Sequence, residues 1–388
     1  MKRNRRAFLS AVGALTVGGC VGSPPDTPSG DAPPATGDSD TSAPPPSTQE
    51  STQKTTTEPE PTTTTIGFAG DTMVGRRLNN IYGDDDVDPA SIWGEFQPRL
   101  QSVDGVLCNL ECSLSTRGER YPGRAFYFRG DPEWAIPALE AGNVQYTSLA
   151  NNHALDFGAT ALMDTITHLD DAGIANAGTG ANPEAAREPA TLTVGDLDVA
   201  VVSFSDEYDF YAATDDRPGI AWISRDYDSE ETRRKMRDAI DRAKATDPDL
   251  LVFSIHWGEN WIERPSEKLV KLGHWLVDQG VDVVHGHSAH VVQGIEQYED
   301  GIILHDTGDL VDDFGIKDNL GNDKSFLFEM TFEGDEPTKI RLVPLHIDDG
   351  VRPPTDEEVE WLRETMRDRA EPFDTTYERA DDGLVVHL

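Results

Sequence analysis

The chain has 388 residues, of which 71 are acidic and 33 are basic, so its formal net charge at pH 7 is -38. A surface this acidic repels nucleic acid and anionic lipid headgroups, which excludes binding driven by phosphate contacts. Such a charge is typical of a protein from an extreme halophile, where concentrated salt screens repulsion beyond a few ångströms. An acidic disordered protein is excluded, because strong and well-spaced apolar runs follow residue 65.

The first twenty residues, MKRNRRAFLSAVGALTVGGC, have the pattern of an export signal. The pair Arg5-Arg6 precedes an apolar stretch that is too short for a permanent transmembrane helix, and a small-residue site ends at Cys20. The pattern predicts a twin-arginine signal with a lipobox over residues 1–20. It also predicts a lipid on Cys20 that anchors the exported protein to the outer face of the cytoplasmic membrane. A cysteine that stands there by chance is the alternative.

Residues 21–64 consist almost entirely of Pro, Ser, Thr, Gly and acidic residues. This composition cannot bury a core, so we predict a disordered tether between the anchor and a globular domain.

From residue 65 onward, short apolar runs alternate with amphipathic helical patterns. The expected strands are TTIGFAG, DGVLCNLE, QYTSLAN, DVAVVSFS, LLVFSIHWG, VDVVHGH and GIILHDTGD, and the expected helices are ATALMDTITHLDDAG, SEETRRKMRDAIDRAKA and SEKLVKLGHWLVDQG. Alternation of this kind predicts an α/β fold in which helices cover a buried sheet. Two antiparallel strands, SFLFEMTFEG and TKIRLVPLHID, close a single domain over residues 65–350.

A C-terminal helical extension follows at residues 351–388. Thr355 and Glu358 form the pattern of a capping box at the start of its helix.

Polar residues capable of chemistry stand at the ends of the expected strands. In open α/β sheets, ligands bind outside the carboxyl ends of the strands, so these residues are expected to converge. Carboxylate, amide and imidazole together form the ligand set of one or two divalent ions such as Mn, Fe or Zn, and two ions need a bridging carboxylate. The residues are Asp71, Asn109, Glu111, Asn151, Asn152, His153, Asp156, His256, His287 and His290.

Simpler roles remain open for several of these residues. Asp71 and Asn152 are also typical helix caps or turn residues. His256 ends an apolar run, where a core histidine bonded to the backbone is an alternative. His285 does not share the spacing of its neighbours His287 and His290, so we predict a structural role for it.

Cys108 and Cys112 are the cysteines that follow Cys20. The stretch LCNLECS is expected to be extended, which would place the two α-carbons too far apart for a disulfide. We therefore predict two unpaired, buried thiols, with a disulfide in an exported protein as the alternative.

The segments GDTMVGR, NLECSLS, NNHALDFG, IHWGEN, GHSAHVVQGIE and TGDLVDD resemble the CapA/PgsA capsule synthesis proteins, which are associated with poly-γ-glutamate. This family belongs to the calcineurin-like metallophosphatase superfamily, and the resemblance covers residues 64 to 330. It implies a four-layered α/β/β/α sandwich, in which helices flank two mixed sheets.

The resemblance also implies roles for individual residues. His153 matches the histidine beside the reacting group, where it can act as a general acid, and Asp156 would orient its ring. Asn109 and Asp309 would contact the metal ligands and hold them in place without binding the metal themselves. The residues that match metal ligands are Asp71, Glu111, Asn152, His256, His287 and His290.

The sequence departs from the superfamily pattern at four positions. Met73 replaces a histidine of the Asp-x-His motif, and Ser288 and Ala289 replace histidine and proline in the Gly-His-His-Pro-His segment. Asp309 stands where asparagine is usual. The first of these differences removes one imidazole from one metal position.

Three functions follow from these patterns. The first is a lipid-anchored, metal-dependent hydrolase or transferase that acts on an anionic polymer such as poly-γ-glutamate. The second is an exported phosphoesterase for small phosphate esters. The third is a non-catalytic scaffold for a capsule synthase complex.

Overall fold

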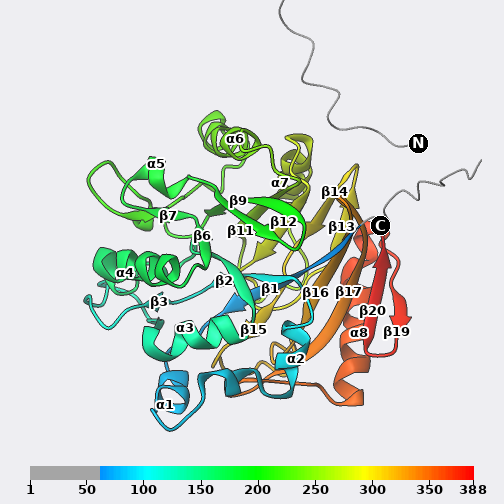
Figure 1. The fold of residues 1–388 in the computed structure, drawn as a ribbon. Coiled ribbons are helices and arrows are strands. Elements are labelled where there is room, and N and C mark those ends of the chain that lie inside the picture. The colour runs from blue at the N-terminus through cyan, green and yellow to red at the C-terminus, as the bar shows by residue number, and fades with distance from the viewer. Residues whose placement is uncertain (1–61) are drawn as a thin grey trace, which may run out of the picture. The chain divides into compact units, whose positions relative to one another are not determined.

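The computed structural model describes residues 62–388. These residues form two mixed β-sheets with helices along their outer sides (Figure 1). None of the helices within this range is both long enough and apolar enough to cross a bilayer. The predicted export signal, the lipidation site Cys20 and nearly all of the predicted tether lie outside the described residues.

The first sheet joins a parallel half to an antiparallel half. Its strand order is β19-β20-β17-β16-β1-β2-β5-β6; two short strands lie outside this order, with β15 paired to β1 and β18 paired to β17. The parallel half consists of β1 (Thr63–Thr72), β2 (Gly105–Leu110), β5 (Val144–Ser148), β6 (Ala175–Ala177) and β15 (Asp309–Val311). The antiparallel half consists of β16 (Lys324–Glu333), β17 (Glu336–Ile347), β18 (Val351–Arg352), β19 (Glu378–Ala380) and β20 (Gly383–His387).

The second sheet has a parallel centre and an antiparallel strand at each edge, in the order β13-β14-β12-β11-β9-β8. The central strands are β9 (Leu197–Ser205), β11 (Leu250–His256), β12 (Val283–His287) and β14 (Gly301–Leu304). The edge strands are β8 (Ala190–Val194) and β13 (Ile295–Tyr298).

Three apolar clusters hold four layers together. One cluster packs α3 (Pro132–Ala141) and α4 (Gly158–Asp171) on the outer face of the first sheet, and another packs α6 (Glu230–Lys244) and α7 (Glu267–Asp278) on the second (Figure 1). The third lies between the sheets and contains Phe68, Val252 and Phe328. The predicted α/β fold with two mixed sheets flanked by helices is confirmed.

The C-terminal segment is part of the sandwich. The helix α8 (Asp356–Ala370) packs on the third cluster through Leu362 and Met366, and β20 pairs with β17 in the first sheet. Thr355 and Glu358 form the predicted capping box. The segment predicted as a helical extension, residues 351–388, thus also supplies three strands of the first sheet, β18, β19 and β20.

Short elements connect the layers. The remaining helices are α1 (Leu78–Tyr82), α2 (Gln97–Leu100), α5 (Pro183–Ala186), η2 (Pro89–Phe96), η3 (Asp209–Tyr211) and η4 (Glu371–Phe373). The remaining strands are β3 (Ser113–Leu114), β4 (Arg129–Gly130), β7 (Thr179–Gly180) and β10 (Gly219–Ile220).

All seven apolar runs predicted as strands and all three predicted helices are present, and β16 and β17 are antiparallel as expected. The helix α3 was not predicted, because Pro137 in its middle interrupts the helical pattern.

Candidate metal centre

The parallel registers bring the strand ends of both sheets to one place. In the first sheet, Asp71 at the end of β1 pairs with Asn109 of β2. In the second sheet, His256 and His287 are paired at the ends of β11 and β12. Because parallel strands present their carboxyl ends at the same edge, local sequence patterns become a shared site only through this pairing.

Two glycines permit the close approaches that the site needs. A Cβ atom on Gly70 would lie 1.8 Å from the carbonyl oxygen of Gly308. The backbone amide of Asp71 donates a 2.9 Å hydrogen bond to the same oxygen. A Cβ atom on Gly286 would lie 2.1 Å from the carbonyl oxygen of His305. The glycines in "GD" and "HGH" are therefore required by packing beside the candidate ligands.

Asp71 is shared by two groups of candidate metal ligands. One group is Asp71, His256 and His287, and the other is Asp71, Glu111 and His290. Its Oδ1 lies 3.8 Å from His256 Nδ1 and 3.6 Å from His287 Nδ1, whereas its Oδ2 lies 3.2 Å from His290 Nδ1. Each oxygen thus faces a different group, which is the arrangement of a carboxylate that bridges two ions.

Several buried polar atoms around Asp71 have no hydrogen-bond partner among the described residues. They are both carboxylate oxygens of Glu111, Oδ1 of Asn152 and Nε2 of His256. An unpaired buried acceptor is costly unless another group satisfies it. Carboxylate, amide oxygen and imidazole are the donors that Mn, Fe and Zn accept, so this donor set fits a divalent ion.

The electrostatics favour the ligand forms of Asp71 and His256. Burial raises the pKa of Asp71, but the hydrogen bond from His290 and the charges of three histidines outweigh it and hold the pKa below its ordinary value. Burial lowers the pKa of His256 to about 4, so its imidazole is neutral near pH 7. Burial and the charge of Asp71 raise the pKa of Glu111 well above its ordinary value, so a bound cation would have to displace its proton.

The two residues predicted to support the ligands do contact them. Asn109 donates a 2.7 Å hydrogen bond from Nδ2 to Asp71 Oδ1, and Asp309 Oδ1 lies 3.0 Å from His290 Nδ1. Asp309 is also the parallel partner of Asp71 in the β1–β15 register. Both contacts limit the rotation of the candidate ligands.

His153 stands next to the second ligand group. Its Nδ1 lies 2.5 Å from Asp156 Oδ2, and its Nε2 lies 3.8 Å from Glu111 Oε1. Burial lowers the pKa of His153, although Asp156 partly opposes this effect. A neutral imidazole that donates Nδ1–H to Asp156 leaves Nε2 free to face the candidate ligands.

The residues that hold Asp156 were not indicated by any sequence pattern. Its two oxygens accept hydrogen bonds from the Phe128 amide at 2.7 Å, from Tyr211 Oη at 3.2 Å and from Arg124 Nε at 3.2 Å. Phe128 also stacks on the His153 ring with a centroid distance of 3.5 Å. Arg124 and Phe128 come from irregular segments, Tyr211 ends the short helix η3, and none of the three belongs to a recognisable motif.

Asp306 is a further residue that no sequence pattern indicated. Its carboxylate accepts hydrogen bonds from the amides of Ala289 at 2.7 Å and Gly308 at 2.8 Å. It therefore joins the loop that carries His290 to the loop beside Asp71. Asp306 lies in the segment HDTGD, where the sequence had pointed to Asp309 instead.

His285 lies apart from the candidate ligands. Its Nε2 lies 3.0 Å from the carbonyl oxygen of Ala69 and 3.2 Å from Thr307 Oγ1, and the ring packs edge-on against Phe68. These contacts match the structural role that the sequence indicated. The loop after β12 then turns sharply, with φ of 118° at Ser288 and 55° at His290, and this turn carries the His290 ring back to Asp71.

Met73 and the two cysteines are also buried. Met73 belongs to the apolar cluster under α3 and α4 and offers no ligand atom of the usual kind. Cys108 and Cys112 are free and buried, which confirms the prediction of two unpaired thiols. Asn151, also named among the strand-end residues, donates hydrogen bonds to Asn109 Oδ1 and to the carbonyl oxygen of Leu110.

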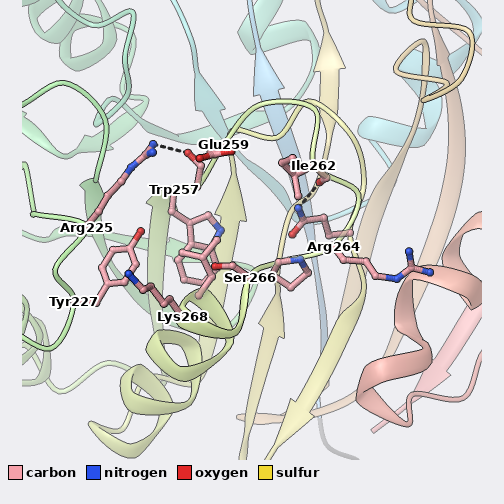
Figure 2. Close-up of a pocket in the computed structure, with 12 residues that line it drawn as sticks. Arg225, Tyr227, Trp257, Glu259, Ile262, Arg264, Ser266 and Lys268 are labelled. Carbon is pink, nitrogen blue, oxygen red and sulfur yellow. Dashed lines mark hydrogen bonds between the residues drawn. The ribbon is translucent and has the colours of Figure 1, made fainter.

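A cavity of about 300 Å³ lies beside this site, between the segments that follow β10 and β11. Figure 2 shows Trp257, the residue after His256, on its wall, and Arg264 pointing away from it. Arg264 forms an ion pair with Asp368 at 2.6 Å, and Arg225 is paired with Glu207. The residues that line the cavity do not include a candidate ligand.

The sequence model of the bacterial capsule synthesis protein PGA_cap matches residues 65–314. The chain belongs to this family. The matched range includes all the candidate ligands and ends before β16, so the resemblance noted in the sequence is confirmed.

Three curated relatives illustrate the likeness. A Mycobacterium tuberculosis protein named "Probable polyglutamine synthesis accessory protein" is 33% identical over 312 residues, which is 76% of this chain and 80% of the relative. The capsule biosynthesis protein CapA of Bacillus anthracis is 27% identical over 341 residues, covering 84% of this chain and 77% of the relative. The PGA biosynthesis protein CapA of Bacillus subtilis is 25% identical over 254 residues, covering 65% and 64%.

A solved structure of a hypothetical protein from Thermus thermophilus has 17% sequence identity and a TM-score of 0.45, and it covers 73% of this chain and 99% of that chain. This likeness is too slight to bear on function.

Proposed function

We propose that this chain is a metal-dependent hydrolase or transferase of the cell surface that acts on an anionic capsule polymer, with poly-γ-glutamate as the candidate substrate. One observation carries the proposal: Asp71 is shared by two buried ligand groups, and unpaired polar atoms of Glu111, Asn152 and His256 surround it. A buried set of this kind is costly for a scaffold that binds no cation.

The residues beside the ligand groups suit acid-base chemistry. A divalent ion held there would polarise a carbonyl or phosphoryl oxygen and lower the pKa of a water molecule. His153 holds a proton on Nδ1 toward Asp156, which leaves Nε2 to exchange a proton with the attacking or leaving group. Burial of the site lowers the local dielectric and strengthens both effects.

The names of the relatives support the polymer. Two of them are named for capsule or PGA biosynthesis, and a third is named as a synthesis accessory protein. On this basis we also propose association with a capsule synthase. The twin-arginine pattern and Cys20 support export and a lipid anchor, which would place the site where a capsule polymer emerges.

The experiment offers the metal-reconstituted protein, in concentrated salt, both γ-linked glutamate oligomers and aryl phosphates. The wild type is compared with Asp71→Ala and His153→Ala. Polymer turnover that both variants lose supports the proposal, whereas turnover of aryl phosphates alone would assign a phosphoesterase. Absence of stoichiometric Mn, Fe or Zn after reconstitution would leave the scaffold role and rule out metal-dependent catalysis.

A further inference from the structure

Two aromatic rings rest on the histidines of the candidate centre, and an arginine covers both rings. Phe128 stacks on His153, and Phe314 packs edge-on against His290 with a centroid distance of 4.9 Å. The guanidinium of Arg76 lies 4.9 Å from the Phe128 centroid and 5.9 Å from that of Phe314. A cation is thus held directly above the rings that border the site.

A second cation, Lys317, lies over another aromatic ring that contacts His290. Trp261 packs on His290 with a centroid distance of 5.0 Å, and Lys317 Nζ lies 4.6 Å from the Trp261 ring centre. Lys317 is exposed, and within residues 62–388 it forms no ion pair. Its charge is therefore available to solvent.

A third cation, Arg124, lies near Asp156 and over an aromatic ring. Arg124 lies 4.2 Å from the Tyr208 ring centre while its Nε binds Asp156. We name this set the cation–aromatic collar, and its members are Arg76, Arg124, Lys317, Phe128, Phe314, Tyr208 and Trp261.

The backbone of the collar is strained. Three of its members, Arg76, Tyr208 and Trp261, have φ values of 53°, 47° and 68°, in the left-handed region that side chains other than glycine rarely occupy. Strain of this kind clusters at ligand-binding sites. Three separate loops adopt it at the border of one site, so it is not the accident of a single turn.

The large exposed apolar side chains gather beside the collar. Within residues 62–388, the large hydrophobic side chains that are exposed are Phe126 at 64%, Phe210 at 39%, Ile262 at 43% and Ile316 at 60%. Each lies within two positions of a collar member along the chain. An exposed apolar rim around a polar site is a sign of a binding surface.

From these observations we propose that the cation–aromatic collar binds a substrate chain on either side of the reacting bond, with Arg76 and Lys317 contacting carboxylates and the aromatic and aliphatic side chains contacting methylene groups between them. A poly-γ-glutamate chain has this composition, because each repeat carries one α-carboxylate and two methylene groups. Arg76 is paired with Asp313 at 3.2 Å, and Arg124 is paired with Asp156. Lys317, unpaired within the described range, therefore supplies the positive charge that such a polymer would meet on a chain whose net charge is -38. This inference rests on the proposed function, since it specifies the residues that recognise the same substrate.

The test measures binding of fluorescent γ-linked glutamate oligomers to the metal-reconstituted full chain at one fixed salt concentration. The variants are Arg76→Gln and Lys317→Gln, and the matched control is Lys339→Gln on β17, near the opposite end of the first sheet from Asp71. Each collar variant is expected to weaken binding by about 2- to 10-fold, which corresponds to one partly exposed ionic contact. The control should bind as the wild type does.

A second ligand separates charge from general affinity. Oligomers whose carboxylates are converted to methyl esters should bind weakly, with the same affinity for the wild type and for both collar variants. Oligomer binding that is unchanged in both collar variants, or weakened equally by Lys339→Gln, would overturn the inference.

Metal content and turnover distinguish this result from a failure of the proposed function. If the collar variants lose affinity while the wild type holds no metal, the collar stands and the metal-dependent activity fails. If wild-type turnover depends on Asp71 while the collar variants bind normally, the activity stands and the collar fails.

Discussion

Replacing Asp156 with asparagine tests how the site controls the proton on His153. The Asp156 carboxylate accepts on one oxygen from His153 Nδ1 and the Phe128 amide, and on the other from Arg124 and Tyr211. Asparagine has the same shape but presents only one acceptor oxygen, so its amide group must face one of these two pairs of donors.

The two orientations have different costs. Asparagine is neutral, so the charge of the buried ion pair with Arg124 is lost in either orientation, which costs about 3–5 kcal/mol because the Arg124 side chain is only 8% exposed. If the amide NH2 faces Arg124, the guanidinium and the Tyr211 hydroxyl also lose their hydrogen-bond acceptor. If the NH2 instead faces His153, one buried backbone N–H, that of Phe128, loses its acceptor, which costs about 1–3 kcal/mol. The second orientation is cheaper, and it forces His153 to accept on Nδ1 and to carry its proton on Nε2.

We therefore expect Asp156→Asn to reduce the free energy of unfolding by about 3–5 kcal/mol, set chiefly by the lost ion pair with Arg124. Because the variant holds the wrong tautomer, turnover should fall by about 10²- to 10⁴-fold. Denaturant unfolding in concentrated salt measures the first quantity, and ¹⁵N chemical shifts of the imidazole report the tautomer. The matched control is Asp164→Asn, which removes a carboxylate paired with Arg117 on the surface and should leave the His153 tautomer unchanged. A variant that keeps the proton on Nδ1 would refute this reasoning.

Three further predictions concern protons and thiols. Because burial raises the pKa of Glu111, metal binding should release a proton and tighten as pH rises, and calorimetry in two buffers should find less proton release in Glu111→Gln. Burial lowers the pKa of His285 to about 4, below the value of about 6.5 expected when unfolded. Its contribution of about 3 kcal/mol is therefore complete above pH 6.5 and is lost as pH falls toward 4. Unfolding of the metal-free wild type should then depend more steeply on pH in this window than that of His285→Gln, and equal slopes would contradict the assignment. Burial raises the pKa of Cys108 to about 12 and also raises that of Cys112, so mass spectrometry should find neither thiol alkylated at pH 8 until the protein unfolds.

Much of the fold follows from local patterns. Alternating apolar runs and helical patterns predicted seven of the parallel strands and three of the covering helices, because strand and helix periodicities are properties of neighbouring residues. The short parallel strands β6 and β15 were not predicted. The helix α3 did not follow, because Pro137 breaks its pattern and only packing against the first sheet stabilises it. The pairing of β20 with β17 also depends on a partner more than thirty residues away, which no local pattern specifies.

The candidate site divides in the same way. Residues that directly follow strands, such as Asp71 and His256, could be named from the sequence because chemistry gathers at strand ends. Arg124, Tyr211 and Asp306 could not be named, because they reach the site from loops whose paths depend on the whole tertiary structure.

The histidines of β12 show what sequence and tertiary structure each contribute. The sequence by itself determines that His285 and His287 lie on the same face of a strand, because side chains alternate with a period of two. The sequence also predicted a structural role for His285, but only the tertiary structure supplies the physical reason, which is that the two histidines lie at different depths. His285 lies level with Ala69 in the space between the sheets, whereas His287, about 6–7 Å further along the strand, reaches Asp71. Long-range register therefore separates a packing histidine from a candidate ligand, and register is set by contacts between residues more than two hundred positions apart.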